Sequence, residues 1–429
     1  MQTKVDEYRS SRILYLIVAA IDYFIAIITT STYLAKLTTS LGIPDGTIGV
    51  INSFVSIAAA FNLVSLFISP TVRAKKIVVT SFTISYFCYV FLYFTPFLKI
   101  SPDVRTAIFA VLFLVACIMT NISFSPKIVW SRGLIERENL GKFTATVEII
   151  SLVAGMGFML VTGALIDYLE AQNKLYTAFI IFGCIIFALG VSSITIWSLI
   201  KEKKVEVTET VSTVQRIKAA ITDRATLTIM PMFMIWYIAI YLTTPFFGTY
   251  QINDLGFSMT VISLLSTGYS LLRALISRPL GKFADKHSFS HTLVIGMLAF
   301  ALGLFILALG GRVAFIIYFM LYAVTLAGTN ASLMNIIYVC VPAEKRVGAM
   351  AVIYTAAGTV GFVTTLLAKP LVDKIQANGN TFLGIEGVYA QQVLSVLGAI
   401  VTLICIAYVI LTVRKLPRKD GKSTDNTKA

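Results

Sequence analysis

Three ionisable side chains lie deep within apolar stretches of this sequence: Asp22, Glu148 and Arg273. A charged side chain near the centre of a bilayer costs about 2.5–3.5 kcal/mol on insertion scales, so each one needs a function or a partner. A carboxylic acid in a low-dielectric cavity also binds a proton more readily, because desolvation penalises its charged form. The chemistry indicated by these residues is reversible proton binding and ion pairing within a membrane.

Asp22 is the residue that we expect to bind a coupled proton. It follows Arg12 by about ten residues, which is about 15 Å along a helix and therefore mid-membrane. Seven-residue spacing puts Tyr15, Asp22, Thr29 and Lys36 on nearly one face of that helix. We expect this polar face to point away from lipid. A packing contact between helices, with no chemical role, is the alternative for Asp22.

The surrounding sequence predicts the helices that would position these residues. Of its 429 residues, 57% are apolar and 13% are charged, and the mean hydropathy is +0.84. This is more hydrophobic surface than one soluble core can hide. Twelve apolar runs are long enough to cross about 30 Å of hydrocarbon as helices. We expect them near 12–37, 47–68, 76–98, 105–130, 141–169, 176–200, 226–251, 258–281, 290–310, 312–339, 348–373 and 388–413.

The two halves of the chain repeat each other. The tripeptide at 21–23, Ile-Asp-Tyr, recurs at 235–237 as Ile-Trp-Tyr, and Thr120-Asn121 recurs as Thr329-Asn330. We therefore predict an all-α membrane protein with twelve transmembrane helices in two pseudo-symmetric six-helix bundles. Tandem halves of this kind are common in transporters. The expected domains are an N-terminal bundle at 1–200, a cytoplasmic linker at 201–225, a C-terminal bundle at 226–414 and a cytoplasmic tail at 415–429.

The basic residues of the chain indicate its orientation. The net charge is +14, and most of the 35 Lys and Arg residues lie at the two ends and in loops after even-numbered spans. By the positive-inside rule, both termini are expected in the cytoplasm. This one-sided distribution argues against nucleic-acid binding. We predict a multi-pass protein of the cytoplasmic (plasma) membrane, also called the cell inner membrane.

Motifs for metals, cofactors and catalysis are not found in the sequence. The five cysteines lie within or beside apolar spans without a CxxC pattern, and the two histidines share one loop. Nucleophile elbows, phosphate loops and cofactor fingerprints are also missing from the polar segments. We therefore expect no metal, no cofactor and no enzymatic activity.

One short motif, taken together with the twelve spans and the six-plus-six repeat, resembles the major facilitator superfamily. Its signature Gly-x-x-x-Asp-Arg/Lys is matched after the eighth span by Gly281, Asp285 and Lys286, whereas the loop at 70–76 has neither Gly nor Asp. The resemblance implies that these three residues form a gating loop. It also implies that Asp285 faces a helix end, for which we expect the start of the fifth helix near Arg137.

The resemblance also implies that the fifth and eighth helices meet across the boundary between the bundles. Glu148 follows Gly141 by seven residues and Arg273 precedes Gly281 by eight, so both are expected about 10–12 Å from the cytoplasmic ends of their helices. We predict an inter-bundle ion pair between Glu148 and Arg273 that breaks when the inner gate opens. Separate packing contacts are the alternative.

In this family the first and seventh helices line a central cavity, and several polar and aromatic residues are candidates for its wall. Amides beside aromatic rings suit polar organic solutes such as sugars, nucleosides, amino acids and many drugs. Hydrogen bonding between helices is the alternative role. The candidates are Tyr15, Tyr23, Thr29, Tyr33, Asn121, Ser123, Trp236, Tyr237, Tyr241, Asn330, Ser332 and Asn335.

These features together predict a secondary active transporter that moves a small polar organic solute by alternating access. Symport with protons through Asp22 is expected, although another coupling ion is an alternative, and we expect a monomer. A multidrug/proton antiporter is the alternative within the class. The resemblance implies that such antiporters carry Arg followed by Gly in the fourth helix and Gly-Pro late in the fifth, whereas here the fourth helix has no mid-membrane Arg and the fifth has no Gly-Pro. A non-transporting sensor on a transporter scaffold is a further alternative.

Overall fold

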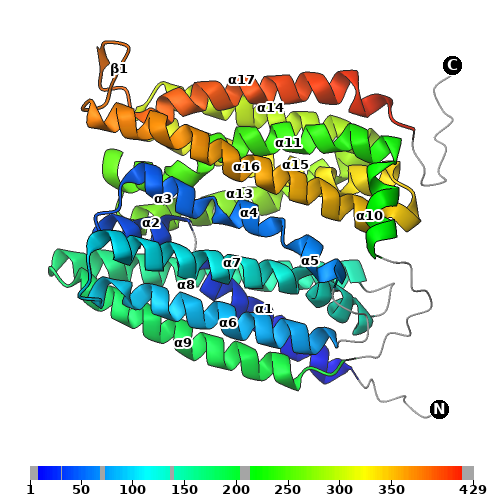
Figure 1. Cartoon of the computed structure of the whole chain (residues 1–429), viewed down its shortest axis with the longest axis horizontal. Coiled ribbons are helices and arrows are strands. Elements are labelled where there is room, and N and C mark those ends of the chain that lie inside the picture. The colour runs from blue at the N-terminus through cyan, green and yellow to red at the C-terminus, as the bar shows by residue number, and fades with distance from the viewer. Residues whose placement is uncertain (1–7, 30, 68–72, 136–139, 203–212, 418–429) are drawn as a thin grey trace. The chain divides into compact units, whose positions relative to one another are not determined.

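The computed structural model describes residues 8–29, 31–67, 73–135, 140–202 and 213–417. Almost all of this chain is helical (Figure 1). In the described part, 12 segments are long and apolar enough to cross a membrane, as predicted. They are Arg9–Ser40, Asp45–Val64, Ala74–Phe97, Pro102–Ile128, Thr146–Ala171, Leu175–Leu199, Arg224–Asp254, Met259–Ala284, Phe289–Ala308, Gly311–Cys340, Ala343–Ala377 and Ala390–Lys415.

Among the first six spans, the second is interrupted by turns at residues 53 and 60–61. The first span consists of α1 (Arg9–Thr29) and α2 (Ser31–Ser40). The second is divided into three short helices, α3 (Asp45–Asn52), α4 (Phe54–Ala59) and α5 (Asn62–Phe67). The remaining four are α6 (Ala74–Phe94, extended by η1, Thr95–Phe97), α7 (Pro102–Gly133), α8 (Leu140–Ala171) and α9 (Leu175–Leu199).

The second six spans follow a short connecting helix, α10 (Thr213–Ile221). The seventh span begins with α11 (Arg224–Thr243), whose first turn is capped by the Asp223 carboxylate accepting from the backbone N–H of Thr226 at 3.0 Å. It continues through η3 (Thr244–Phe246), α12 (Phe247–Thr249) and the π-turn η4 (Tyr250–Asp254). The last spans are α13 (Met259–Lys286), α14 (Phe289–Ala308), α15 (Gly311–Cys340), η5 (Ala343–Lys345) with α16 (Arg346–Ala377), and α17 (Ala390–Leu411) with η6 (Val413–Lys415).

Between α16 and α17 lies a small hairpin of β1 (Thr381–Phe382) and β2 (Ile385–Glu386), which pair antiparallel. Its turn contains Leu383 and Gly384, both at positive φ. A two-residue turn of this kind requires left-handed backbone at both positions, which glycine adopts readily.

Two compact units are present, Met1–Thr210 with Gly248–Leu264, and Val211–Phe247 with Leu265–Ala429. The first unit therefore includes a segment, Gly248–Leu264, that joins the seventh and eighth spans in sequence. The boundaries predicted from sequence do not anticipate this assignment.

Equivalent spans pack in the same way within each unit. In the first, α6 packs against α7 and α9, and α1 packs against α8 and α9. In the second, α14 packs against α15 and α17, and α11 packs against α16 and α17. This repeated pattern confirms the prediction of two pseudo-symmetric bundles of transmembrane helices.

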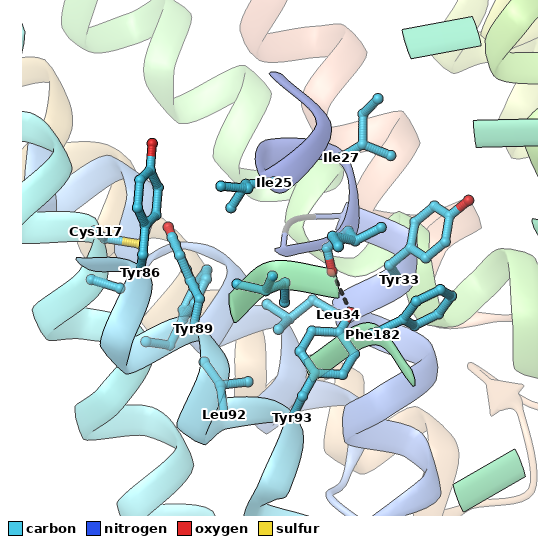
Figure 2. Packing of buried hydrophobic residues seen from close by; sticks show 14 of the residues in the cluster. Ile25, Ile27, Tyr33, Leu34, Tyr86, Tyr89, Leu92, Tyr93, Cys117 and Phe182 are labelled. Carbon is cyan, nitrogen blue, oxygen red and sulfur yellow. Dashed lines mark hydrogen bonds between the residues drawn. The ribbon is translucent and has the colours of Figure 1, made fainter. Parts of the chain in front are cut away.

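Aromatic and branched side chains fill the core of the first unit (Figure 2). The hydroxyl of Tyr93 donates to the backbone carbonyl of Ile28, which ties α6 to α1. Close helix approach also depends on glycine, since a Cβ atom at Gly155 of α8 would overlap the ring of Tyr23. The core thereby fixes α1 against its neighbours, and with it the polar side chains that α1 carries.

Candidate functional site

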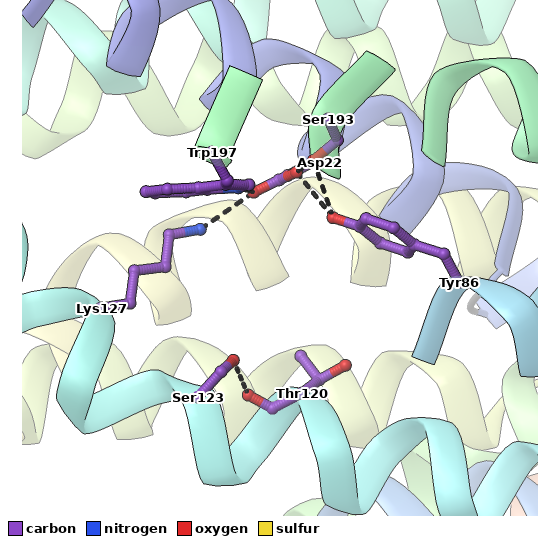
Figure 3. Close-up of polar contacts among 7 residues, drawn as sticks. All are labelled: Asp22, Tyr86, Thr120, Ser123, Lys127, Ser193 and Trp197. Carbon is purple, nitrogen blue, oxygen red and sulfur yellow. Dashed lines mark hydrogen bonds and ion pairs between the residues drawn. The ribbon is translucent and has the colours of Figure 1, made fainter. Parts of the chain in front are cut away.

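Asp22 lies at the centre of a polar cluster within the first unit (Figure 3). Tyr86 Oη and Ser193 Oγ each donate to Asp22 Oδ1 over 2.6 Å. Lys127 Nζ and Trp197 Nε1 donate to the other carboxylate oxygen, Oδ2, over 3.1 Å and 3.3 Å. The donors come from α6, α7 and α9, so this one carboxylate bonds to three helices besides its own. Hydrogen bonds to an ionised group are shorter and stronger than neutral ones.

The partner charge of Asp22 is Lys127, and both side chains are largely removed from solvent. The exposed fraction is 23% for the Lys127 side chain and 14% for that of Asp22. The Lys127 ammonium also lies 5.1 Å from the ring centroid of Phe82 and 5.0 Å from that of Trp197. A cation over an aromatic face gains electrostatic stabilisation even where water is scarce. Lys127 is therefore held by the rings as well as by the carboxylate.

The sequence did not reveal Lys127, because a basic residue near the end of a span is normally assigned to the cytoplasmic surface. The structure instead continues α7 through Pro126 to Gly133, which leaves Lys127 inside the helix. The available signal was its position between the apolar residues Phe124 and Ile128.

The predicted polar face of the first helix points into the first unit. Tyr15 contacts the ring of Trp197 edge-on at 5.5 Å, beside the Asp22 cluster. Thr29 is buried, and its hydroxyl donates to the carbonyl of Ile25 in its own helix. The structure thus brings Tyr15 together with Asp22 and places Thr29 among the packed helices, whereas Tyr23 packs on α8.

Tyr33 and Lys36 lie further along the same span, away from Asp22. The hydroxyl of Tyr33 hydrogen-bonds with that of Thr162 at 2.8 Å and donates to the carbonyl of Met159 at 3.0 Å. Lys36 forms an ion pair with Glu170. These bonds connect α2 to α8.

On α7, Asn121 and Ser123 bond chiefly within their own unit. Asn121 Nδ2 donates to the carbonyl of Cys117 at 2.9 Å, and its oxygen accepts from Asn62 at 3.4 Å. Ser123 is buried and donates to the carbonyl of Thr120 at 2.7 Å (Figure 3). Asn121 therefore links α5 to α7, while Ser123 stabilises its own helix.

The equivalent positions in the second unit have aromatic neighbours. Trp236, which matches Asp22 in the repeat, is 2% exposed and meets Phe300 edge-on at 5.3 Å. Tyr237 and Tyr241 stack on each other at 5.5 Å on the same helix.

The remaining candidates of the second unit lie on α15 with different exposures. Asn330 is exposed and Asn335 is half-buried. Ser332 is buried, and its hydroxyl has no hydrogen-bond partner within the described ranges. None of the three is therefore fixed in a polar cluster comparable to that of Asp22 in the described structure.

Glu148 and Arg273 lie in different units, on α8 and α13 respectively. Glu148 is exposed and Arg273 is half-buried. Their ion pair stays a prediction.

The predicted gating loop is helical. The structure extends α13 to Lys286, so Gly281, Asp285 and Lys286 lie in its last turns and not in a loop. A basic residue in the last turn favours this extension, since it complements the helix dipole. Gly281 and Lys286 are exposed. The side chain of Asp285 and its expected neighbour Arg137 fall outside the described residues, so the role in gating stays a prediction.

A second polar cluster of the first unit surrounds the start of α13, and the sequence did not predict it. The two carboxylate oxygens of Asp167 accept the backbone N–H groups of Met259 at 2.8 Å and Thr260 at 2.7 Å. These N–H groups belong to the first turn of α13, where a carboxylate is favoured by the helix dipole. A Cβ atom at Gly163 would overlap the hydroxyl of Ser263, so α8 and α13 approach closely here.

Two further bonds connect the segment Gly248–Leu264 to the first two spans. Asn253 donates to the carboxylate of Asp45 at 3.0 Å, and Thr32 donates to the side-chain oxygen of Gln251 at 3.2 Å. Together with Asp167, they explain why this segment belongs to the first unit. If both termini are cytoplasmic, as predicted, all these contacts lie at the extracellular end of the spans.

Metal binding gains no support from the geometry. Across the described ranges, no three His, Cys, Asp or Glu side chains come close enough together to hold a metal ion.

Comparisons with known proteins agree with this architecture. The family model described as Major Facilitator Superfamily matches residues 14–258 and 230–429. Among curated proteins, no sequence matches.

Several solved structures share the fold. A mutant of the nucleoside transporter NupG has a TM-score of 0.72 at 13% identity, covering 93% of this chain and 99% of that one. A bacterial homolog of the human lysosomal transporter Spinster, inward-facing and unoccupied, has a TM-score of 0.70 at 12% identity, with 96% and 98% covered. A D-xylose-proton symporter has a TM-score of 0.64 at 14% identity, with 92% and 98% covered.

Proposed function

This chain belongs to the major facilitator superfamily, and we propose that it is a proton-coupled symporter for a small polar organic solute. Membership of this family, together with the 12 apolar helices, makes the protein a multi-pass membrane transporter. The observation that supports proton coupling is the Asp22 cluster, in which one carboxylate and one ammonium face each other among aromatic rings. An acid inside a membrane span is a common proton relay in transporters.

Protonation of Asp22 would change the forces between four helices. A proton on the carboxyl group cancels the charge that now attracts Lys127 and weakens the bonds from Tyr86 and Ser193. Lys127 would then be held by Phe82 and Trp197 alone. Because α1, α6, α7 and α9 all contribute to the cluster, their packing in the protonated and unprotonated states would differ.

Coupling requires that proton and solute favour the same conformation. A ligand shifts a conformational equilibrium only by its difference in affinity for the two states. In the proposal, the proton on Asp22 and the bound solute both favour the state that carries the solute inward. Two proteins with the same fold, a nucleoside transporter and a D-xylose-proton symporter, support a nucleoside or a sugar as the solute.

We also propose that the protein is a monomer of the plasma membrane with both termini in the cytoplasm. The distribution of Lys and Arg supports this orientation of the termini. Single cysteines in a variant lacking the five natural ones would test this orientation. A cysteine at the hairpin position Glu386 should react with a membrane-impermeant maleimide on intact cells, and one at Lys286 should react only after lysis. The opposite pattern would overturn the orientation.

Transport by reconstituted protein tests the proposed function. Liposomes with an imposed pH gradient, acidic outside, should accumulate the solute, and a protonophore should abolish the accumulation. Asp22→Asn should lose accumulation but retain exchange of labelled for unlabelled solute, because exchange needs no net proton movement. Asp373→Asn is the matched control, since Asp373 pairs with Lys369 on α16 outside the cluster. Accumulation that survives both the protonophore and Asp22→Asn would exclude proton coupling.

A further inference from the structure

Six tyrosines from four helices form a row within the second unit. Two pairs stack directly: Tyr237 on Tyr241, with ring centroids 5.5 Å apart and planes at 29°, and Tyr269 on Tyr322, at 6.0 Å and 22°. Offset stacking at such separations is a favourable geometry for aromatic rings. The members of the row are Tyr237 and Tyr241 on α11, Tyr269 on α13, Tyr322 and Tyr338 on α15, and Tyr354 on α16.

The two stacked pairs and the remaining tyrosines are neighbours of one another. Tyr241 lies close enough to Tyr322 for their hydroxyl groups to interact electrostatically. The hydroxyl group of Tyr354 is likewise within electrostatic range of that of Tyr237, and the hydroxyl group of Tyr338 is within range of that of Tyr354. The row therefore brings together tyrosines from α11, α13, α15 and α16.

The row differs from the aromatic core beside it in exposure. All six tyrosines are half-buried, whereas Trp236 and Phe300, which lie in the core, are 2% and 0% exposed. Tyr237 is thirteen residues into α11, or about 20 Å along its axis, and therefore near mid-membrane. A phenol hydroxyl that faced hydrocarbon there would lose its hydrogen bonds at considerable cost. The accessible parts of these rings are therefore better suited to a polar interior than to lipid.

We infer that the tyrosine row is the surface on which the transported solute binds, and that the solute carries an uncharged planar heterocycle, as nucleosides do. This inference rests on the proposed transport function and specifies its substrate class. Tyrosine rings stack on the faces of a planar ring, while their hydroxyls both donate to and accept from its edge atoms.

The composition of the row narrows the class further. Its six members are uncharged phenols, so the row itself offers no carboxylate to a positively charged ring and no cation to a phosphate group. A pyranose sugar offers several adjacent hydroxyls, which carboxylates and amides bind in pairs, whereas the row offers ring faces and single hydroxyls. A neutral nucleoside satisfies each of these conditions.

Direct binding to the full-length purified protein tests the inference. Titrations with uridine and adenosine are compared with D-xylose and with a neutral amino acid, using Tyr241→Ala, Tyr322→Ala and the corresponding phenylalanine variants. Tyr168→Ala is the matched control, because Tyr168 is 63% exposed on α8 in the first unit. The thermal transition of each variant shows whether it folds.

We expect the nucleosides to bind and the other solutes not to bind. Each alanine variant should weaken nucleoside binding about tenfold, because stacking contributes about 1–3 kcal/mol per base and 1.4 kcal/mol is a factor of ten. Each phenylalanine variant keeps the ring and should change affinity less than about threefold, and Tyr168→Ala should not change it. If an alanine variant does not fold, competition on the natural protein decides: free planar bases should displace the nucleoside and D-xylose should not.

Preferential binding of the sugar or the amino acid, or alanine variants with unchanged nucleoside affinity, would overturn the inference. Uptake measured on the same preparations separates this result from the proposed function. If a non-planar solute is taken up in response to the pH gradient and the tyrosine variants do not change its uptake, proton coupling stands and the proposed class of planar solutes is rejected. If nucleosides bind with the predicted pattern among the variants but a pH gradient has no effect on their uptake, the proposed solute class stands and proton coupling is rejected.

Discussion

Asp22 and Trp236 occupy the same position in the two halves of the repeat and have opposite surroundings. Asp22 accepts hydrogen bonds from four side chains and faces an ammonium group. Trp236 is buried against Phe300. The helices around both positions nevertheless pack in the same pattern. Duplication has thus preserved the packing of the spans while the chemistry of the two interiors has diverged.

The difference has a physical reason. Helix packing in a membrane depends on shape, which many apolar side chains can supply. A buried carboxylate instead requires hydrogen-bond donors and a counter-charge, and all of them must be present for the charged group to be stable. The first unit supplies Tyr86, Lys127 and Ser193 for this purpose. The two proposals together assign proton binding to the first unit and an aromatic surface for the solute to the second.

The largest loss of stability is expected when an acid is placed at the equivalent position of the second unit. Trp236→Asp should destabilise the protein by more than about 4 kcal/mol, because it removes a buried indole and leaves a carboxylate in an apolar core. Unfolding in mixed micelles, followed by circular dichroism, would measure the loss. Trp236→Phe retains an aromatic ring and should cost much less. Near-normal stability of Trp236→Asp would mean that the second unit can also support an acid.

Removal of the counter-charge tests the first unit. Lys127→Met keeps the length of the side chain but leaves Asp22 without its cation, and should destabilise the protein by about 3 kcal/mol. This is the lower end for a broken buried pair, because Tyr86, Ser193 and Trp197 still donate to the carboxylate.

A double variant provides the control. Combining Lys127→Met with Asp22→Asn removes both charges and should recover most of the lost stability, since no uncompensated charge remains. Additive losses in the double variant would show that the two residues do not form an energetic pair.

A smaller effect is expected from two aspartates that correspond in the repeat, Asp167 and Asp373, which follow Leu-Ile in the first half and Leu-Val in the second. Asp167→Asn should cost about 1 kcal/mol, because a neutral amide accepts the N–H groups at the start of α13 less strongly than a carboxylate does. Asp373→Asn should cost less than about 0.5 kcal/mol, because its ion pair with Lys369 is more than one-third exposed. Equal losses in thermal stability would remove this distinction between the halves.

The sequence predicted the architecture well because length and hydropathy determine which segments cross a bilayer, and the repeat then divides them into two bundles. It also selected Asp22, since a lone acid in an apolar span is conspicuous. It missed Lys127, because lysines near span ends usually lie at the surface. Asp167 and its partner Thr260 are 93 positions apart, so their contact appears only after the helices are packed. The tyrosine row was found only in part, because its members come from four helices.

The central claim is that Asp22 carries the coupled proton. The electrical current that accompanies transport of the solute tests this claim most directly. Proteoliposomes adsorbed to a solid-supported membrane report the charge that moves when an uncharged solute is added. We expect an inward positive current for the natural protein and for Asp373→Asn, and no steady current for Asp22→Asn even though the solute still exchanges. A current of natural size in Asp22→Asn would contradict it.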